Sequence, residues 1–197
     1  MIKRHFHRRN LPHLYYNDGI YFVTYRLYGS IHQIEIEKYH RWIMKLKMNP
    51  LLQKRIFKKY DALLDRPANE IRFLQNNEIM EICKKSLHYY DEKLYKLICY
   101  CIMPNHIHLI FDLISEEKDI GQIMSSIKKF SGRRANKILG KQGPFWQAES
   151  FDRLVRDDIE LYFIIKYVLL NPVIAGLVEN WRDWKGTYCH PDYEVLD

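Results

Sequence analysis

Two histidines that lie one residue apart give the chain its clearest candidate for metal chemistry. His106 and His108 occur in the segment Met-Pro-Asn-His-Ile-His, residues 103–108. Side chains alternate between the two faces of a strand, so both imidazoles would point one way and Ile107 the other. Two imidazoles on one face of a rigid strand form a preorganised pair of metal ligands. A chance His-x-His pair on a half-buried strand is the alternative interpretation.

A tyrosine and an asparagine near the C-terminal end form a second candidate group. Tyr167 and Asn171 are four residues apart, a spacing that places both on one face of a helix. A phenol can attack phosphorus as a covalent nucleophile, and a divalent cation that polarises the phosphate oxygens would help it. Asn171 could be a third, oxygen-donating metal ligand. With fifteen tyrosines in the chain, a packed core or surface aromatic is the alternative for Tyr167.

Strands must hold the histidines in place. Residues 93–103 and 106–114 are two apolar runs separated only by Pro104-Asn105, a pattern that predicts an antiparallel hairpin. Residues 20–28 are rich in aromatic and β-branched side chains and predict another strand, and shorter strands are expected near 71–74 and within 148–155. Interleaved strands and helices with antiparallel pairing indicate an α+β fold.

Helices are expected to present the tyrosine and several cations. Asp157 and Glu160 have the spacing of a capping box, which begins a helix that we expect to end at Leu170, before Pro172. Further helices are expected over 32–64, with a break at Asn49-Pro50, and over 77–90. A basic amphipathic helix over 119–139 carries four candidate DNA-binding cations, namely Lys128, Lys129, Arg133 and Arg134.

Composition narrows the class of protein. The chain has 197 residues, a net charge of +7 and 47% apolar residues, which excludes wholesale disorder and suits one domain. Four cysteines occur without a CxxC pair, and no apolar stretch follows the basic N-terminus, so we expect a cytoplasmic protein without a membrane span. Aromatic residues make up 14%, and Trp146 beside Gly143-Pro144 could stack an unpaired base or fill the core.

Several segments, in order along the chain, resemble one family. Residues 103–110 resemble the His-hydrophobe-His (HUH) motif of single-tyrosine, IS200-like transposases, and 167–178 resemble their tyrosine helix and the segment after it. The chain is most similar to the branch called REP-associated tyrosine transposases. Further segments carry the same resemblance: 8–13, 21–27, 143–153 and 180–184.

The resemblance implies a ferredoxin-like core of HUH endonuclease type, with a four-stranded antiparallel sheet and helices. It implies a metal-dependent transposase that cleaves single-stranded DNA near hairpin-forming palindromic repeats and transfers strands in DNA transposition and recombination. Tyr167 would be the nucleophile, giving a 5′-phosphotyrosine, and Mg²⁺ or Mn²⁺ would be bound by His106, His108 and Asn171. The protein would act as a monomer or a homodimer.

The sequence predicts one domain with appended segments, and it leaves two other functions to compare with the transposase. The chain 1–197 is expected to form one domain with a basic N-terminal arm (1–14), a helical insertion (about 41–66) and a short C-terminal tail (181–197). The insertion is a solvated helical segment or a DNA contact. A catalytically inactive module of the same fold that binds nucleic-acid hairpins is one alternative function. A histidine-triad hydrolase is a poor fit, since Ile110 stands at the third histidine position.

Overall fold

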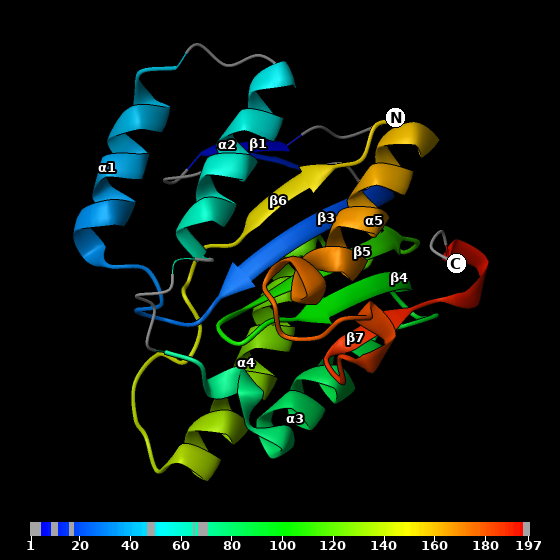
Figure 1. Ribbon diagram of the computed structural model, residues 1–197. Coiled ribbons are helices and arrows are strands. Elements are labelled where there is room, and N and C mark those ends of the chain that lie inside the picture. Colours follow the sequence, from blue (N-terminus) through cyan, green and yellow to red (C-terminus); the bar gives the residue numbers. More distant parts are fainter. Residues whose placement is uncertain are drawn as a thin grey trace.

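A five-stranded antiparallel sheet forms the centre of the molecule (Figure 1). The computed structural model describes residues 5–8, 12–15, 18–46, 50–64, 66 and 71–194. The strand order is β6-β3-β5-β4-β7. The strands are β3 (Gly19–Arg26), β4 (Tyr95–Ile102), β5 (His106–Leu113), β6 (Phe151–Leu154) and β7 (Thr187–Cys189).

The hairpin of β4 and β5 confirms the strongest strand prediction. Ile102 pairs with Ile107 and Tyr95 with Leu113, with one irregularity between Leu97 and Cys99. β5 pairs with β3 on its other side along its whole length, from Gly19 opposite Leu113 to Arg26 opposite His106. The strand with the histidine pair is therefore central, and neighbours on both sides hold its backbone.

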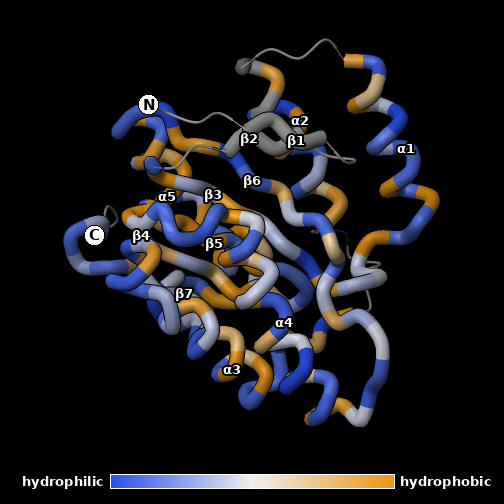
Figure 2. Tube along the Cα trace, turned by 180° about the vertical axis from the view of Figure 1, so that it is seen from behind, coloured by the Kyte–Doolittle hydropathy of each residue, from blue (hydrophilic) through white to orange (hydrophobic). Residues whose placement is uncertain are grey.

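The two faces of the sheet carry different helices. α3 (Asn77–His88) and α4 (Ile120–Leu139) pack on one face against the odd-numbered side chains of β3 and β5. α5 (Asp158–Ile174) packs on the other face, where Phe22 and Ile110 lie. Hydrophilic and hydrophobic residues alternate along α3 and α4 (Figure 2), as expected for helices with one face on the sheet.

Two further helices lie beside the α5 face. α1 (Gln33–Met44) and α2 (Pro50–Leu64) form a separate apolar cluster that reaches the sheet at Phe151. These two helices account for most of the expected insertion, and the break expected at Asn49-Pro50 lies partly outside the described residues. The insertion is thus packed against the sheet and is not a wholly solvated segment.

The C-terminal tail contributes a strand that was not expected, so the sheet has five strands and not four. Four strands were predicted, but residues 187–189 pair with β4, with Tyr100 opposite Tyr188, and make a fifth strand. The backbone N–H of Ile102 donates to the carbonyl of Gly186 at 2.8 Å, and the indole of Trp184 donates to the carbonyl of Ile102 at 2.9 Å. These hydrogen bonds pair backbone groups of β4 that would otherwise lie at an open sheet edge. A strand as short as β7, with few β-branched residues, is difficult to predict from the sequence.

Two other local predictions were wrong. A strand was expected at 71–74, but Phe73–Gln75 forms a short 3₁₀ helix before α3. α5 was expected to end at Leu170, but it continues through Pro172 to Ile174. Proline lacks an N–H and crowds the preceding turn, yet near the last turn of a helix only one backbone hydrogen bond is lost.

At the N-terminal end, β1 (His5–Arg8) and β2 (Pro12–Tyr15) pair with each other in a separate two-stranded hairpin. The expected basic arm therefore includes regular backbone structure in the part that the structure describes. Residues 1–4 and 9–11 of that arm, and 195–197 of the tail, lie outside the described residues.

Candidate metal centre and tyrosine site

The two predicted histidines meet at the start of β5, on the face that α5 covers. The Nε2 atoms of His106 and His108 are 3.0 Å apart, and both side chains are almost wholly buried. Opposite them on β3 lie Arg26 and Thr24, in register with His106 and His108. The alternation of side chains along β5 therefore brings the imidazoles together, as the sequence predicts.

Asn105 determines which nitrogen of His106 carries its proton. The Asn105 amide nitrogen donates to the carbonyl of Leu64 at 3.0 Å, so its oxygen is the atom that lies 2.6 Å from His106 Nδ1. An amide oxygen only accepts, and Nδ1 must therefore donate. The proton of neutral His106 is thus on Nδ1, and its Nε2 presents a lone pair toward His108. Fixing the tautomer in this way is a common feature of histidine metal ligands.

His108 stands at the centre of the site. Its Nδ1 lies 2.8 Å from the Thr24 hydroxyl, which orients the ring. Its Nε2 faces the Tyr167 hydroxyl at 3.2 Å and the Asn171 amide nitrogen at 3.4 Å. The four residues predicted to form the catalytic and metal site, from β5 and α5, therefore lie together within a single chain.

Burial keeps both imidazoles neutral. Desolvation lowers the pKa of His106 to about 3. Desolvation also holds the pKa of His108 well below its usual range, and the neighbouring His106 lowers it further. Since metal ions bind the neutral imidazole, both rings are in the ligand-competent form at neutral pH.

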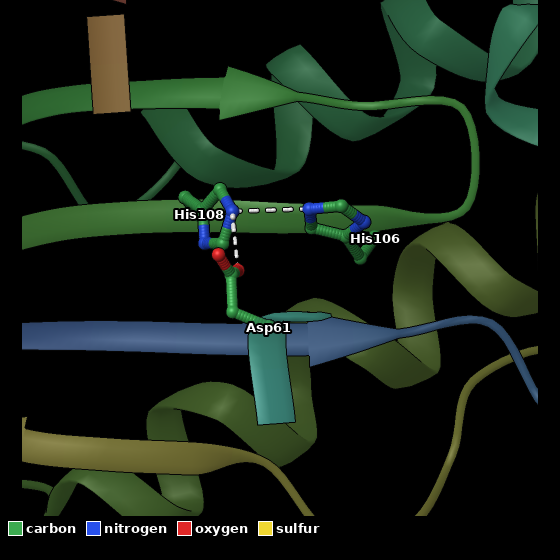
Figure 3. A group of neighbouring side chains, drawn as sticks. All are labelled: Asp61, His106 and His108. Carbon is green, nitrogen blue, oxygen red and sulfur yellow. Dashed lines mark hydrogen bonds and ion pairs between the residues drawn. The ribbon is translucent and has the colours of Figure 1, made fainter. Parts of the chain in front are cut away.

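Asp61 on α2 is a polar neighbour of the histidines that the sequence analysis missed. Its Oδ1 is 3.6 Å from His108 Nε2, and ligand atoms of Asp61, His106 and His108 lie within 4.8 Å of one another. Figure 3 shows the carboxylate pointing from α2 toward His108. One feature of the sequence could have indicated Asp61 as a candidate ligand. It is the only acidic residue between Glu37 and Asp65, in an otherwise basic segment.

The donor set fits a divalent cation. One imidazole nitrogen holds one proton or one lone pair, yet His108 Nε2 has four polar groups at 3.0–3.6 Å. A cation between Asp61, His106 and His108 would engage their lone pairs, and Asn171 would join the ligand set through its amide oxygen and not through the nitrogen that faces His108. Ligands about 2.1 Å from an octahedral ion are about 3 Å apart when adjacent. Imidazole, carboxylate and amide oxygen all bind Mn²⁺, and Mg²⁺ prefers the oxygen donors.

Aromatic rings enclose the site beside the tyrosine. Phe57 of α2 lies edge-on to Tyr167, with ring centroids 5.6 Å apart, and 6.2 Å from His108. Phe22 of β3 lies 4.9 Å from Phe57 and 5.8 Å from His108. Tyr167 is itself partly exposed. The phenol thus has one side fixed by packing and another that a ligand can reach.

The predicted DNA-binding residues lie elsewhere, along α4. Lys128, Lys129, Arg133 and Trp146 line one groove of about 990 Å³ between α4 and residues 143–152. Lys129, Arg133 and Arg134 are exposed, but Arg134 does not line the groove and stacks over Phe130 at 4.3 Å. Lys129 and Arg133 are thus exposed cations of a groove that Asp119, Glu149 and Asp152 also line.

Two of these five residues turn inward. The Lys128 ammonium donates to the Ala148 carbonyl at 2.9 Å and to the Ser150 hydroxyl at 3.0 Å, and desolvation lowers its pKa to about 8. Trp146 is only 6% exposed, and its indole donates to Ser131 at 2.9 Å. In this conformation Trp146 fills the core, which was the alternative interpretation, and offers no free ring face to a base.

Fold and site together define a class of protein. An antiparallel sheet with a histidine pair on a central strand, opposite a helix with a partly exposed tyrosine, is the arrangement of HUH-type enzymes. The profile of the family described as IS200-like transposase matches residues 66–169. The chain belongs to the IS200-like transposase family.

Similar proteins point to one branch of that family. A putative REP-associated tyrosine transposase of Haemophilus influenzae is 26% identical over 128 residues, which covers 60% of this chain and 71% of the relative. A REP-associated tyrosine transposase of Escherichia coli is 23% identical over 101 residues, 51% of this chain and 58% of the relative.

A solved structure shares the fold. It is described as a REP-associated tyrosine transposase bound to a REP hairpin, and it matches with a TM-score of 0.50 and 17% identity. The match covers 86% of this chain and 75% of the other. Among the residues that the structure describes, no helix is both long and apolar enough to span a membrane.

Proposed function

We propose that the protein is a metal-dependent tyrosine transposase that cleaves and rejoins single-stranded DNA at or near hairpin-forming repeats. The observation that carries this proposal is the approach of the Tyr167 hydroxyl to within 3.2 Å of His108 Nε2. A nucleophile and the ligands of its metal must meet at one phosphate for the reaction to occur. A protein that only binds hairpins has no need of this juxtaposition.

The proposed reaction exchanges one phosphoester for another. The Tyr167 oxygen forms a bond to phosphorus, the bond from phosphorus to the 3′ oxygen breaks, and a 5′-phosphotyrosine results. The proton lost by the phenol balances the proton gained by the leaving 3′-OH. Attack of another 3′-OH reverses the step and joins two strands without an external energy source, because the number of phosphoesters does not change.

In the proposed reaction, different residues of the site bind the metal ion, orient its ligands and limit the access of water. His106, His108 and Asn171 would hold Mg²⁺ or Mn²⁺, which supplies Lewis-acid polarisation of the scissile phosphate. Asn105 and Thr24 orient the two imidazoles through their Nδ1 atoms. Phe57 and Phe22 pack around the reacting groups and limit access of bulk water on their side.

Single-stranded DNA with hairpin or palindromic repeats is the proposed substrate. The similar solved structure is of a transposase bound to a REP hairpin, and the two relatives named above are REP-associated. Lys129 and Arg133 in the α4 groove, with Arg134 nearby, would contact backbone phosphates. Lys128, bonded inward, would support the groove wall.

Tyr167→Phe tests the nucleophile, since it removes only the hydroxyl. We expect wild-type protein, incubated with a labelled hairpin oligonucleotide and Mn²⁺, to give a protein-linked band on a denaturing gel. Tyr167→Phe should abolish that band and leave hairpin binding nearly unchanged. Tyr162→Phe is the matched control, because Tyr162 is an exposed tyrosine of the same helix.

Each result has a distinct meaning. A band that survives Tyr167→Phe would reject Tyr167 as the nucleophile. Tight hairpin binding without any band in the wild type would favour the alternative, an inactive hairpin-binding module of the same fold. Loss of the band in His106→Ala, with binding retained, would support the role of the metal.

A further inference from the structure

We propose that Asp61 of α2 is a further ligand of the divalent metal ion, supplying the only carboxylate of the ligand set. The inference rests on the proposed function, since it concerns the same ion that His106 and His108 would hold. Asp61 lies before the segment 66–169 that matches the family profile. The carboxylate would thus be a property of this chain's inserted helix and not of the matched segment.

The position of the carboxylate suits coordination better than direct bonding to histidine. Asp61 Oδ1 is 3.6 Å from His108 Nε2, too far for a hydrogen bond between them. A carboxylate oxygen of Asp61 also lies within 4.8 Å of a ring nitrogen of His106. An ion about 2.1 Å from each donor places adjacent ligands about 3 Å apart and opposite ligands about 4.2 Å apart, which brackets the first distance.

Contacts between α2 and the rest of the protein hold the Asp61 carboxylate beside the histidines. The Asn105 amide donates to the carbonyl of Leu64, in the turn after Asp61. The Tyr39 hydroxyl donates to the carbonyl of Ile56 at 2.9 Å, in the turn before it. Phe57, four residues before Asp61 and on the same helix face, packs against His108 and Tyr167.

Charge explains what the carboxylate would add. Two neutral imidazoles and an amide leave the full +2 charge of the ion uncompensated in a buried site, which is costly in a low dielectric. One carboxylate reduces that net charge to +1 before any DNA phosphate arrives. Asp61 would therefore allow the protein to hold its metal ion in the absence of substrate.

Mn²⁺ binding to the full chain without DNA tests this inference. We expect Asp61→Asn, which keeps the shape and removes the charge, to weaken Mn²⁺ binding by about 10-fold or more in calorimetric titration, a loss of the size seen when groups around a metal site are changed. Asp61→Glu should recover part of the affinity. Asp112→Asn, at the far end of β5, is the matched control and should bind Mn²⁺ as the wild type does.

A second measurement separates coordination from a general electrostatic effect. If Asp61 binds the ion, Asp61→Ala should leave a ligand position that water fills, and the number of Mn²⁺-bound waters seen by electron–nuclear double resonance should rise by one. A through-space charge effect would leave that number unchanged, and this result would overturn the proposal. So would an Asp61→Asn affinity within twofold of wild type.

The same titrations distinguish this inference from the proposed function. If His106→Ala removes Mn²⁺ binding and the Asp61 variants do not weaken it, Asp61 is not a ligand and the His106, His108 and Asn171 site still stands. If wild-type protein binds no Mn²⁺, or binds it equally after His106→Ala, the metal site itself is wrong and the role of Asp61 falls with it.

Discussion

At the scale of single residues, the site depends on buried groups that orient the two imidazoles. The Thr24 hydroxyl and the Asn105 amide each contact the Nδ1 atom of one imidazole, so that the Nε2 atoms converge. Because Asn105 also bonds to the Leu64 carbonyl, one side chain links the histidine tautomer to the position of α2. Orientation of the ligands is therefore built into the sheet and the adjoining turn.

Thr24→Val tests this orienting role. Valine has nearly the same shape as threonine but no hydroxyl, so His108 would lose the partner of its Nδ1 atom. We expect Mn²⁺ affinity to fall by about 10-fold or more, in line with the loss of other groups that orient metal ligands. Thr187→Val, which removes a hydroxyl that donates to Cys101 Sγ in β4, is the control and should not change Mn²⁺ affinity. Equal affinities of Thr24→Val and wild type would contradict the role.

The residues of the site differ in how far the sequence could reveal them. His106 with His108, and Tyr167 with Asn171, are recognisable because their spacing matches the period of a strand and of a helix. Asp61 has no such local signature, since its approach to His108 depends on how α2 packs against β3 and α5. For Trp146 the sequence left two interpretations open, because a tryptophan beside a glycine-proline turn does not reveal whether its ring is buried, and in this structure it is.

At the scale of elements, α5 and β7 are two cases in which the local sequence did not predict the observed secondary structure. The rule that a helix ends before proline predicted an end at Leu170, yet α5 continues to Ile174. The backbone N–H of Ala175 donates to the Asn171 carbonyl at 3.0 Å, so Asn171 stays helical and beside His108. The long strands were predictable from their apolar runs, whereas β7 has three residues and forms because β4 offers it an edge.

Gly186→Ala tests the attachment of β7 to the sheet. A Cβ atom at position 186 would lie 2.5 Å from the Ile102 carbonyl oxygen and 2.7 Å from Trp184 Nε1. Those distances are shorter than carbon contacts in proteins, so the tail must shift and the bond from Trp184 to Ile102 is strained. We expect the free energy of unfolding, measured with urea, to fall by about 1–3 kcal/mol. Lys185→Ala, at an exposed neighbour, should change it by less than about 0.5 kcal/mol.

At the scale of the whole molecule, the buried imidazoles connect the site to stability. A folded protein that keeps two histidines neutral must give up stability when its unfolded chain can protonate them. The net charge of +7 adds self-repulsion that grows as the carboxylates are neutralised. The self-repulsion can be predicted from the composition. The loss of stability through histidine protonation depends on the burial of the two side chains, which only the fold shows.

The pH dependence of unfolding follows from these shifts. In the unfolded chain a histidine has a pKa near 6.5, whereas burial lowers the pKa of folded His106 to about 3. Above pH 6.5 neither state binds the proton, and between 6.5 and 3 only the unfolded state does. Stability should therefore fall as the pH falls, by up to about 1.4 kcal/mol per pH unit for each such histidine.

Urea unfolding in EDTA at pH 7.5 and pH 5.0 checks this expectation. His106→Gln should show a smaller loss between the two values than the wild type, because one of the buried groups is gone. His190→Gln, at a partly exposed histidine outside the site, should keep the wild-type loss. Identical losses in all three proteins would mean that His106 is protonated as readily in the folded chain as in the unfolded one.

The presence of Tyr167 beside His108 in the same polypeptide has a consequence for stoichiometry. Where a nucleophile comes from a neighbouring subunit, a lone copy is inert and the rate falls with the square of the concentration on dilution. Here one copy carries every group of the proposed reaction. On the proposed chemistry, a single molecule per DNA end would suffice for a break, and specific activity would stay constant on dilution.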